Sequence, residues 1–302
     1  MFILSRKYLP MDSKKITDKK HLDWLGFSLF AITMILLFTA ISEGEFVGYG
    51  NLFIISAFIA TIIFFVSFII REKKAKMPML DLNLFKNKLF SLSIFCAFIS
   101  FFVISSSTLI LPYYLQDLRV LSPFWCGIIM LASPLVMMLV APLSGSASDK
   151  FGSEILTFIG LIIVSISLSL MALLYNQNII IFVVPLIIGI MAIGNAMFQS
   201  PNTSLIMSTV PRDELGIAGS INGLVRNAGM VCGVAVSSVL LWSIMSRKIG
   251  YKVLTFIPEQ PDAFVHALRG VFIIEAIICM IGVVLTGIRI WSRKSKKEQI
   301  IE

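Results

Sequence analysis

Two ionisable side chains inside long apolar segments are the first residues of this sequence that could do chemistry. Arg226 and Glu275 each lie within such a segment, and a charge in hydrocarbon is costly unless it is paired or serves a function. At about 1.5 Å per helical residue, Arg226 would lie roughly 16 Å and Glu275 roughly 21 Å from the same membrane surface. The pattern predicts either an ion pair between two helices, or a proton or substrate site.

Amide side chains form a second group of candidates. Asn195, Gln199 and Asn202 recur at helical spacing and so share one helix face, and Asn222 and Arg226 share a face of the next helix. Lipid cannot satisfy amides, so both faces are expected to turn inward. They would then line a substrate vestibule at the cytoplasmic end, or hydrogen-bond one helix to another.

The segments that carry these residues are long and apolar all round. Hydrophobic residues make up 57% of the 302 residues and charged residues 14%, whereas a soluble domain carries about 25% charged residues. The apolar runs lack the alternation of barrel strands. We therefore predict an all-α, multi-pass membrane protein embedded in a lipid bilayer. Its eight spans are expected at 24–42, 52–70, 89–115, 124–144, 155–175, 179–207, 215–246 and 269–291.

The basic residues orient these spans. With the N-terminus inside, most of the 25 Lys and Arg residues fall on the inner side, so both termini and the 71–88 loop are predicted to be cytoplasmic. The loop between the seventh and eighth spans is discordant, because it places four cations outside. These are Arg247, Lys248, Lys252 and Arg269.

Composition and motifs also exclude several function classes. The net charge of +8 is spread between apolar segments, without the basic patch that nucleic-acid binding requires. The two histidines stand in separate loops, the four cysteines have no close pair, and no Gly-Lys-Ser phosphate loop occurs. We therefore expect no enzyme activity, no cofactor, no metal site and no nucleic-acid partner.

Glycines in the seventh span predict where helices approach closely. Gly219 and Gly223 form one four-residue pair, and Gly229 and Gly233 form another. Such pairs let two helix backbones come together in a membrane, so both pairs are expected to be structural.

One polar stretch between the fourth and fifth spans carries a family resemblance. It reads Gly145-Ser-Ala-Ser-Asp149-Lys150-Phe-Gly152. In a short cytoplasmic loop it resembles the loop motif of the major facilitator superfamily, in the copy that belongs to the second six-helix half.

Further stretches resemble the fourteen-helix drug:proton antiporter branch of that superfamily, and they occur in the family's order. They are Asp23-Trp24-Leu-Gly26, Pro78 to Asn87, Leu111 to Gly127, and Gln199 to Gly229. In this register the first two spans match the branch's central linker helices, and the other six match its C-terminal half. The family's first six helices have no counterpart here.

The resemblance implies four regions and a function. The regions are a basic cytoplasmic segment 1–22, linker helices and a loop at 23–88, a six-helix transporter half at 89–292, and a tail at 293–302. The implied function is proton-coupled efflux of hydrophobic, amphipathic or cationic compounds across the cell membrane. Protons and a separate N-terminal half, or a second copy, would be partners. The alternative is a non-transporting membrane subunit or an inactive remnant.

Overall fold

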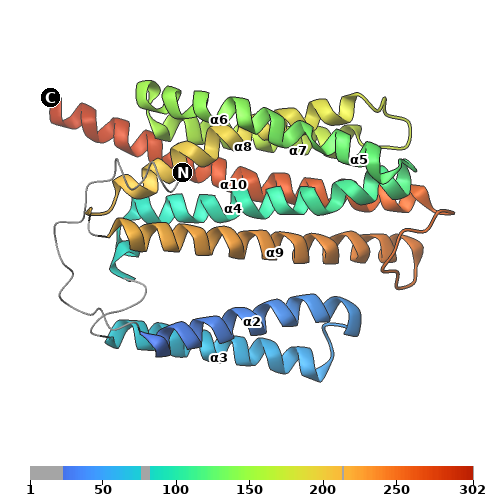
Figure 1. The fold of residues 1–302 in the computed structure, drawn as a ribbon, viewed down its shortest axis with the longest axis horizontal. Helices are drawn as coiled ribbons and strands as arrows, with labels where there is room; N and C mark the ends of the chain where they lie inside the picture. The colour runs from blue at the N-terminus through green and yellow to red at the C-terminus, as the bar shows by residue number, and fades with distance from the viewer. Residues whose placement is uncertain (1–22, 76–81, 213, 302) are drawn as a thin grey trace, which may run out of the picture.

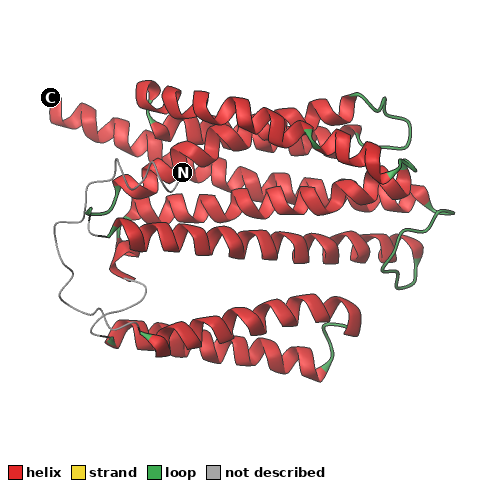
Figure 2. Cartoon of the chain, in the orientation of Figure 1, coloured by secondary structure: helices red, strands yellow, loops and turns green. Residues whose placement is uncertain are grey.

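The computed structural model describes residues 23–75, 82–212 and 214–301. Helices and short loops make up this described part, which contains no strand (Figure 2). Eight helical segments are long and apolar enough to cross a membrane, so the predicted all-α membrane fold is confirmed. The elements in chain order are α2 (Trp24–Val47), α3 (Leu52–Lys74), η1 (Leu82–Lys86), α4 (Lys88–Pro112), η2 (Tyr113–Leu118), α5 (Pro123–Met130), α6 (Ala132–Phe151), α7 (Ser153–Leu174), α8 (Val183–Ser208), α9 (Leu215–Ile249) and α10 (Pro261–Ile301). The expected segment 1–22 lies outside the described residues.

Some helix ends differ from the prediction. The last helix begins at Pro261, well before the expected residue 269, since proline suits the first helical position while the polar residues that follow lower the hydropathy there. The sixth span begins at Val183, because residues before it form turns. The fourth span continues helically to Phe151, so part of the expected loop is helix.

The helices α4 to α10 lie side by side in a bundle, and α2 and α3 lie beside it (Figure 1). Helix α4 packs along α9, α7 packs between α8 and α10, and α6 lies on α8. The helices α2 and α3 form a hairpin that packs on itself and contacts α9 through α2. The six-helix bundle and the hairpin are therefore two packing units, and α2 contacts the bundle at α9.

Glycines allow a close helix approach between α4 and α9. A Cβ on Gly229 would stand 2.8 Å from the carbonyl oxygen of Phe98, and one on Gly233 would collide with the carbonyl oxygen of Phe102. This pair was correctly predicted to allow close packing. The other pair does not do so, because a Cβ on Gly219 would reach only Met207 at 3.5 Å and one on Gly223 would meet nothing within 4 Å.

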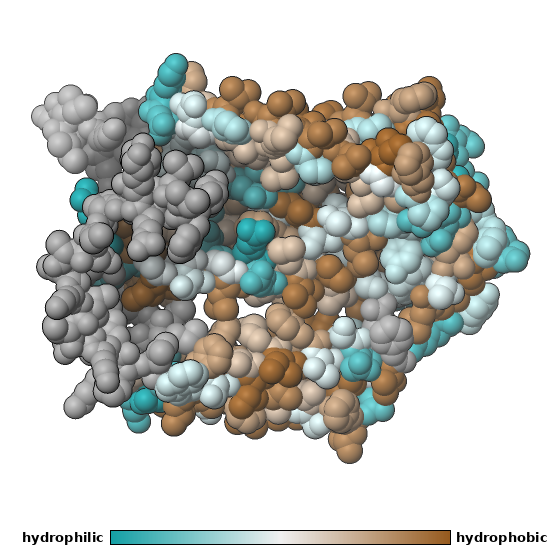
Figure 3. Space-filling view, in the orientation of Figure 1, coloured by the Kyte–Doolittle hydropathy of each residue, from teal (hydrophilic) through white to brown (hydrophobic). Residues whose placement is uncertain are grey.

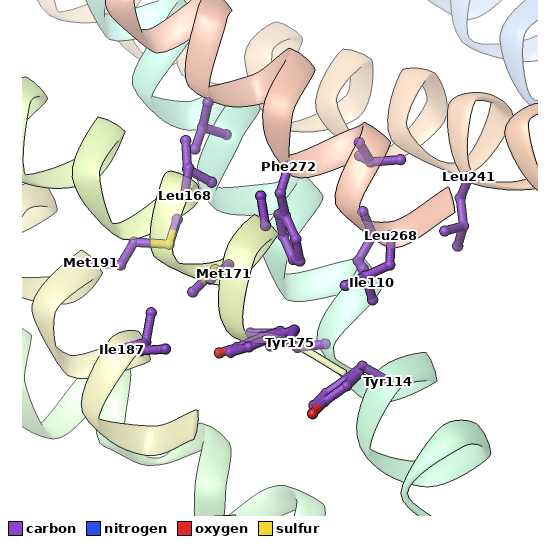
Figure 4. Packing of buried hydrophobic residues seen from close by; sticks show 14 of the residues in the cluster. Ile110, Tyr114, Leu168, Met171, Tyr175, Ile187, Met191, Leu241, Leu268 and Phe272 are labelled. Carbon is purple, nitrogen blue, oxygen red and sulfur yellow. The ribbon is translucent and has the colours of Figure 1, made fainter. Parts of the chain in front are cut away.

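Aromatic side chains hold one end of the bundle together (Figure 4). The rings of Tyr114 and Tyr175 stack at 4.8 Å, and Phe272 meets Tyr175 edge-on at 5.9 Å. The Tyr114 hydroxyl donates a hydrogen bond of 2.9 Å to the carbonyl of Asn176. Helix η2, the end of α7 and the first third of α10 are therefore fixed together by burial and by one directional bond.

An ion pair joins the two helices of the hairpin at the end where α2 begins and α3 stops. The Asp23 carboxylate caps α2 by accepting from the Gly26 N–H at 3.0 Å, and the Arg71 guanidinium lies 3.2 Å from the same oxygen. The Gly26 hydrogen bond lowers the pKa of Asp23 below its ordinary value, burial opposes this and the charge of Arg71 reinforces it.

The outer surface of the bundle is largely apolar. Leu52, Leu143 and Leu173 are 81%, 68% and 71% exposed, and Figure 3 shows broad hydrophobic areas with a hydrophilic patch over α9 near the middle of the face. Hydrocarbon is the solvent that such a surface fits.

Candidate functional site

A cavity of 260 Å³ lies among α4, α6 and α8, and Met130 and Met171 of α5 and α7 complete its wall. We call it the Asn195 cavity. Its lining is mostly apolar, with four polar side chains. The lining residues are Ile104, Ser107, Thr108, Leu111, Met130, Ser133, Pro134, Met171, Ile188, Met191 and Asn195.

Two of the four polar side chains of this cavity are available to a ligand. Asn195 is 3% exposed, and its Oδ1 accepts no hydrogen bond from any described residue. The buried Ser107 hydroxyl likewise has no described partner. An apolar pocket with a few such groups can hold a small molecule by burial and orient it by hydrogen bonds. The methionines allow the wall to adapt to different shapes.

The predicted amide face on α8 divides into two uses. Asn195 faces the cavity, whereas Asn202 is 2% exposed and donates from Nδ2 to the Ser93 carbonyl of α4 at 3.0 Å. Helix-to-helix bonding is thus the structural use of Asn202. Gln199, between them, is half-buried and does not line the Asn195 cavity.

The predicted face on α9 lies apart from the Asn195 cavity. Asn222 is half-buried, and Arg226 is exposed with its guanidinium 5.2 Å from the centre of the Phe101 ring on α4. A cation above an aromatic face is attracted by the ring quadrupole. Arg226 therefore has a partner that needs no carboxylate.

Glu275 lies fully buried among three helices. Its Oε1 accepts from the Ser106 hydroxyl of α4 and from the Ser237 hydroxyl of α9, the latter at 3.1 Å. Its Oε2 is buried and has no hydrogen-bond partner among the described residues.

The predicted ion pair between Arg226 and Glu275 is wrong. Glu275 is level with Ser237, which lies about 16 Å along α9 from Arg226 at 1.5 Å per residue. The error arose from combining depths measured from the two membrane surfaces across a core of about 30 Å. Helix α9 has 35 residues and is about 52 Å long, so the two depths do not bring the side chains to one level.

The family-like motif is also more helical than expected. Gly145, Asp149 and Lys150 belong to the last turns of α6, and only Gly152 stands between α6 and α7. Gly152 has φ 89°, a left-handed conformation in which a Cβ is strained. The sharp reversal needs this glycine, and Asp149 and Lys150 are exposed beside it.

Sequence reasoning missed the hydroxyl groups of α4. Ser105, Ser106 and Ser107 are buried. The Ser105 hydroxyl donates to the Met230 carbonyl of α9 at 2.7 Å, and the Ser106 hydroxyl donates to Glu275. Ser107 lines the Asn195 cavity. A run of adjacent hydroxyls in an apolar span was the signal, because lipid offers them no partner.

Arg289 was assigned only to the cytoplasmic charge count, and it has a further role. Its guanidinium donates to the Thr157 hydroxyl of α7 at 3.0 Å and to the Ser93 hydroxyl of α4 at 3.4 Å. The arginine therefore joins α4, α7 and α10 at the end of the bundle where the Asn202 bond also reaches Ser93.

Several known proteins are similar to this chain. It is 32% identical over 285 residues to the riboflavin transporter RibZ of Clostridioides difficile (strain 630), covering 94% of this chain and 59% of that protein. It is 27% identical over 282 residues to the lincomycin resistance protein LmrB of Bacillus subtilis (strain 168), covering 91% and 58%. With the multidrug resistance protein Stp of Mycobacterium tuberculosis (strain ATCC 25618 / H37Rv), identity is 25% over 257 residues, covering 85% and 47%.

The chain spans about half the length of these curated relatives. The family model of the Major Facilitator Superfamily matches residues 22–234 and residues 93–302. Together with eight apolar helices of spanning length, these matches identify a multi-pass membrane protein of transporter type. The chain belongs to the Major Facilitator Superfamily.

Proposed function

We propose that this chain forms one wall of a pathway that exports hydrophobic or amphipathic compounds, cationic ones included, in exchange for protons. The observation that carries the proposal is the Asn195 cavity, which combines an apolar, methionine-rich wall with an amide oxygen that no described residue satisfies. Relatives named for lincomycin resistance, multidrug resistance and riboflavin transport support a small-molecule substrate.

The resemblance to the fourteen-helix branch suggests where this chain would lie in a two-half transporter. In repeat-built transporters the substrate site lies between two halves near the membrane midplane, and one half rocks against the other. We propose that α2 and α3 are the linker helices, that α4 to α10 are the C-terminal half, and that six further helices or a second copy face them. Gln199, Asn222 and Arg226 would line the cytoplasmic entrance.

The test compares two changes on α8 in cells that express the transporter. Asn195→Leu removes the amide and should lower export of fluorescent lipophilic cations by about tenfold or more, because the apolar side chain cannot orient the substrate. Ser208→Ala is the matched control, since that hydroxyl bonds only to the Leu205 carbonyl of its own helix among the described residues. Equal export by both variants would exclude the Asn195 cavity as the site.

A membrane subunit that does not transport is the second candidate. It predicts that neither variant changes the cell's accumulation of any compound, even though both proteins reach the membrane in normal amounts. A loss of export confined to Asn195→Leu would exclude it.

A further inference from the structure

A groove on the surface between α7 and α10 is separate from the Asn195 cavity. It has a volume of 580 Å³ and shares no lining residue with that cavity. Its lining is apolar except at two serines and at one end, where an arginine stands. The residues are Ser165, Ser169, Ala172, Leu173, Arg269, Ile273, Ala276, Ile277 and Met280.

The groove has the length and surface of a lipid-chain site. From Arg269 to Met280 it follows α10 for about 16 Å at 1.5 Å per residue. Ile273, Ile277 and Met280 are 51%, 58% and 49% exposed, so a straight apolar chain laid along them would cover side chains at every turn.

Arg269 stands where this groove meets a polar cavity of 520 Å³. Its Nε is buried and makes no hydrogen bond with any described residue. Lys248 and amide side chains line the same polar cavity, while its one carboxylate, Asp262, already accepts from Gln177 Nε2 at 2.8 Å. The cavity thus carries two cations and one carboxylate, and this excess of positive charge favours an anion.

The charge pattern of the chain points to the same place. Arg269 and Lys248 belong to the one loop region whose cations break the predicted positive-inside distribution. Cations on the outer side, where the positive-inside distribution disfavours them, are expected to have a specific function there. Binding an anion at the cationic end of an apolar groove is such a function.

We propose that the α7–α10 groove binds an acidic phospholipid, with the phosphate against Arg269 and Lys248 and one acyl chain along Ile273, Ile277 and Met280. The occupant is a bilayer component held on the lipid side of the bundle. A zwitterionic lipid or the exported compound itself would be the competing occupants, and the test separates them.

The experiment measures lipid retained by the whole purified chain. The protein is exchanged into mixed micelles of phosphatidylglycerol or phosphatidylcholine, and bound lipid is counted by native mass spectrometry. Wild type should retain phosphatidylglycerol in preference to phosphatidylcholine. Arg269→Gln should lower phosphatidylglycerol retention about fivefold, the effect of about 1 kcal/mol per cation near anionic lipid, and leave phosphatidylcholine retention unchanged.

Arg247→Gln is the matched control, because Arg247 belongs to the same basic region but lines neither the groove nor its polar end. Ile277→Phe fills the groove without changing charge and should also lower retention. If Arg269→Gln does not fold, Lys248→Gln and Ile277→Phe take its place, and normal retention by both overturns the proposal. Equal losses in Arg247→Gln, equal retention of the two lipids, or displacement of the lipid by a lipophilic cation would also overturn it.

Discussion

At the scale of single residues, the polar chemistry inside the bundle gathers on α4. Adjacent serines of that helix reach Glu275 on α10, a carbonyl on α9 and the Asn195 cavity. Glu275 is therefore held by hydroxyls instead of by a cation. An acid held in this way can serve as a structural hydrogen-bond acceptor, as a proton site, or as both, and its amide and alanine variants separate these roles.

We predict that Glu275→Gln folds with near-normal stability, because glutamine keeps the oxygen that accepts from Ser106 and Ser237. Glu275→Ala should lose about 2–4 kcal/mol, since it empties a buried volume and leaves two hydroxyls unsatisfied. Thermal unfolding in detergent measures both. If Gln is as damaging as Ala, the acceptor account fails.

The Glu275→Gln variant also tests whether this carboxyl group carries a transported proton. If Glu275 carries a transported proton, Glu275→Gln folds normally but uncouples export from the proton gradient. Unchanged coupling in that variant would assign Glu275 to structure alone.

At the scale of elements, glycines on α9 allow its backbone to approach that of α4 closely. Gly229 and Gly233 face the backbone of α4, whereas a Cβ on Gly219 would touch only the Met207 side chain and one on Gly223 would meet nothing within 4 Å. Helix α9 therefore has a tight backbone contact at Gly229 and Gly233, and room for a side chain at Gly223.

We predict opposite signs for alanine on the two halves of α9. Gly233→Ala should destabilise the protein by about 1–3 kcal/mol, because the new Cβ collides with α4. Gly223→Ala should be neutral or stabilising by up to about 1 kcal/mol, because alanine is the better helix former and nothing stands near it. Equal melting shifts for the two variants would contradict this packing.

The α2–α3 hairpin is predicted to weaken in acid. The pKa of Asp23 lies below its ordinary value near 3.8, so its stabilisation is present above that pH and is lost as pH falls toward and through the lowered pKa. Asp23→Asn should remove this loss. Thermal unfolding between pH 6 and pH 3 measures it.

One arginine variant and one lysine variant complete the test of acid sensitivity. Arg71→Gln should reduce the acid sensitivity in part, since the Gly26 hydrogen bond remains, whereas Lys73→Gln should leave it unchanged because Lys73 is exposed beside the pair. An unaltered acid transition in Asp23→Asn would assign the transition to other carboxyl groups.

At the scale of the whole molecule, the α2–α3 hairpin runs alongside α9 in the direction of the bundle helices (Figure 1). The turn after α2 and the end of α3 lie at opposite ends of the hairpin. If the hairpin spans the bilayer, these two sites face different compartments, and the basic residues that end α3 mark the inner one.

We predict that a cysteine at Gly50 is labelled by an impermeant thiol reagent in intact cells and that one at Lys74 is not. Gly50 is chosen over Gly48, whose φ of 98° disfavours any side chain. The background variant lacks the four native cysteines. Lys74→Cys should be labelled only after the membrane is opened, and labelling in intact cells would invert the topology.

The sequence alone determined the all-helical membrane architecture, the approximate positions of the spans and the family. Unbroken apolar runs have few structural solutions in lipid, because every backbone polar group must be satisfied within its own segment. It also predicted that Asn195 turns inward and that Gly229 and Gly233 allow close packing, because helical periodicity fixes which residues share a face.

Only the tertiary structure decided which polar groups meet. The depth of a side chain depends on the length of its helix, and α9, with 35 residues, is longer than a bilayer core requires, so Glu275 lies far from Arg226 and beside two serines. Likewise the three amides of α8 share a face by spacing, yet only the packing of α4 and α6 gives Asn195 a cavity and Asn202 a carbonyl. Periodicity gives the direction of a side chain within one helix, whereas its partner depends on the rotation and displacement of the neighbouring helices, which packing sets.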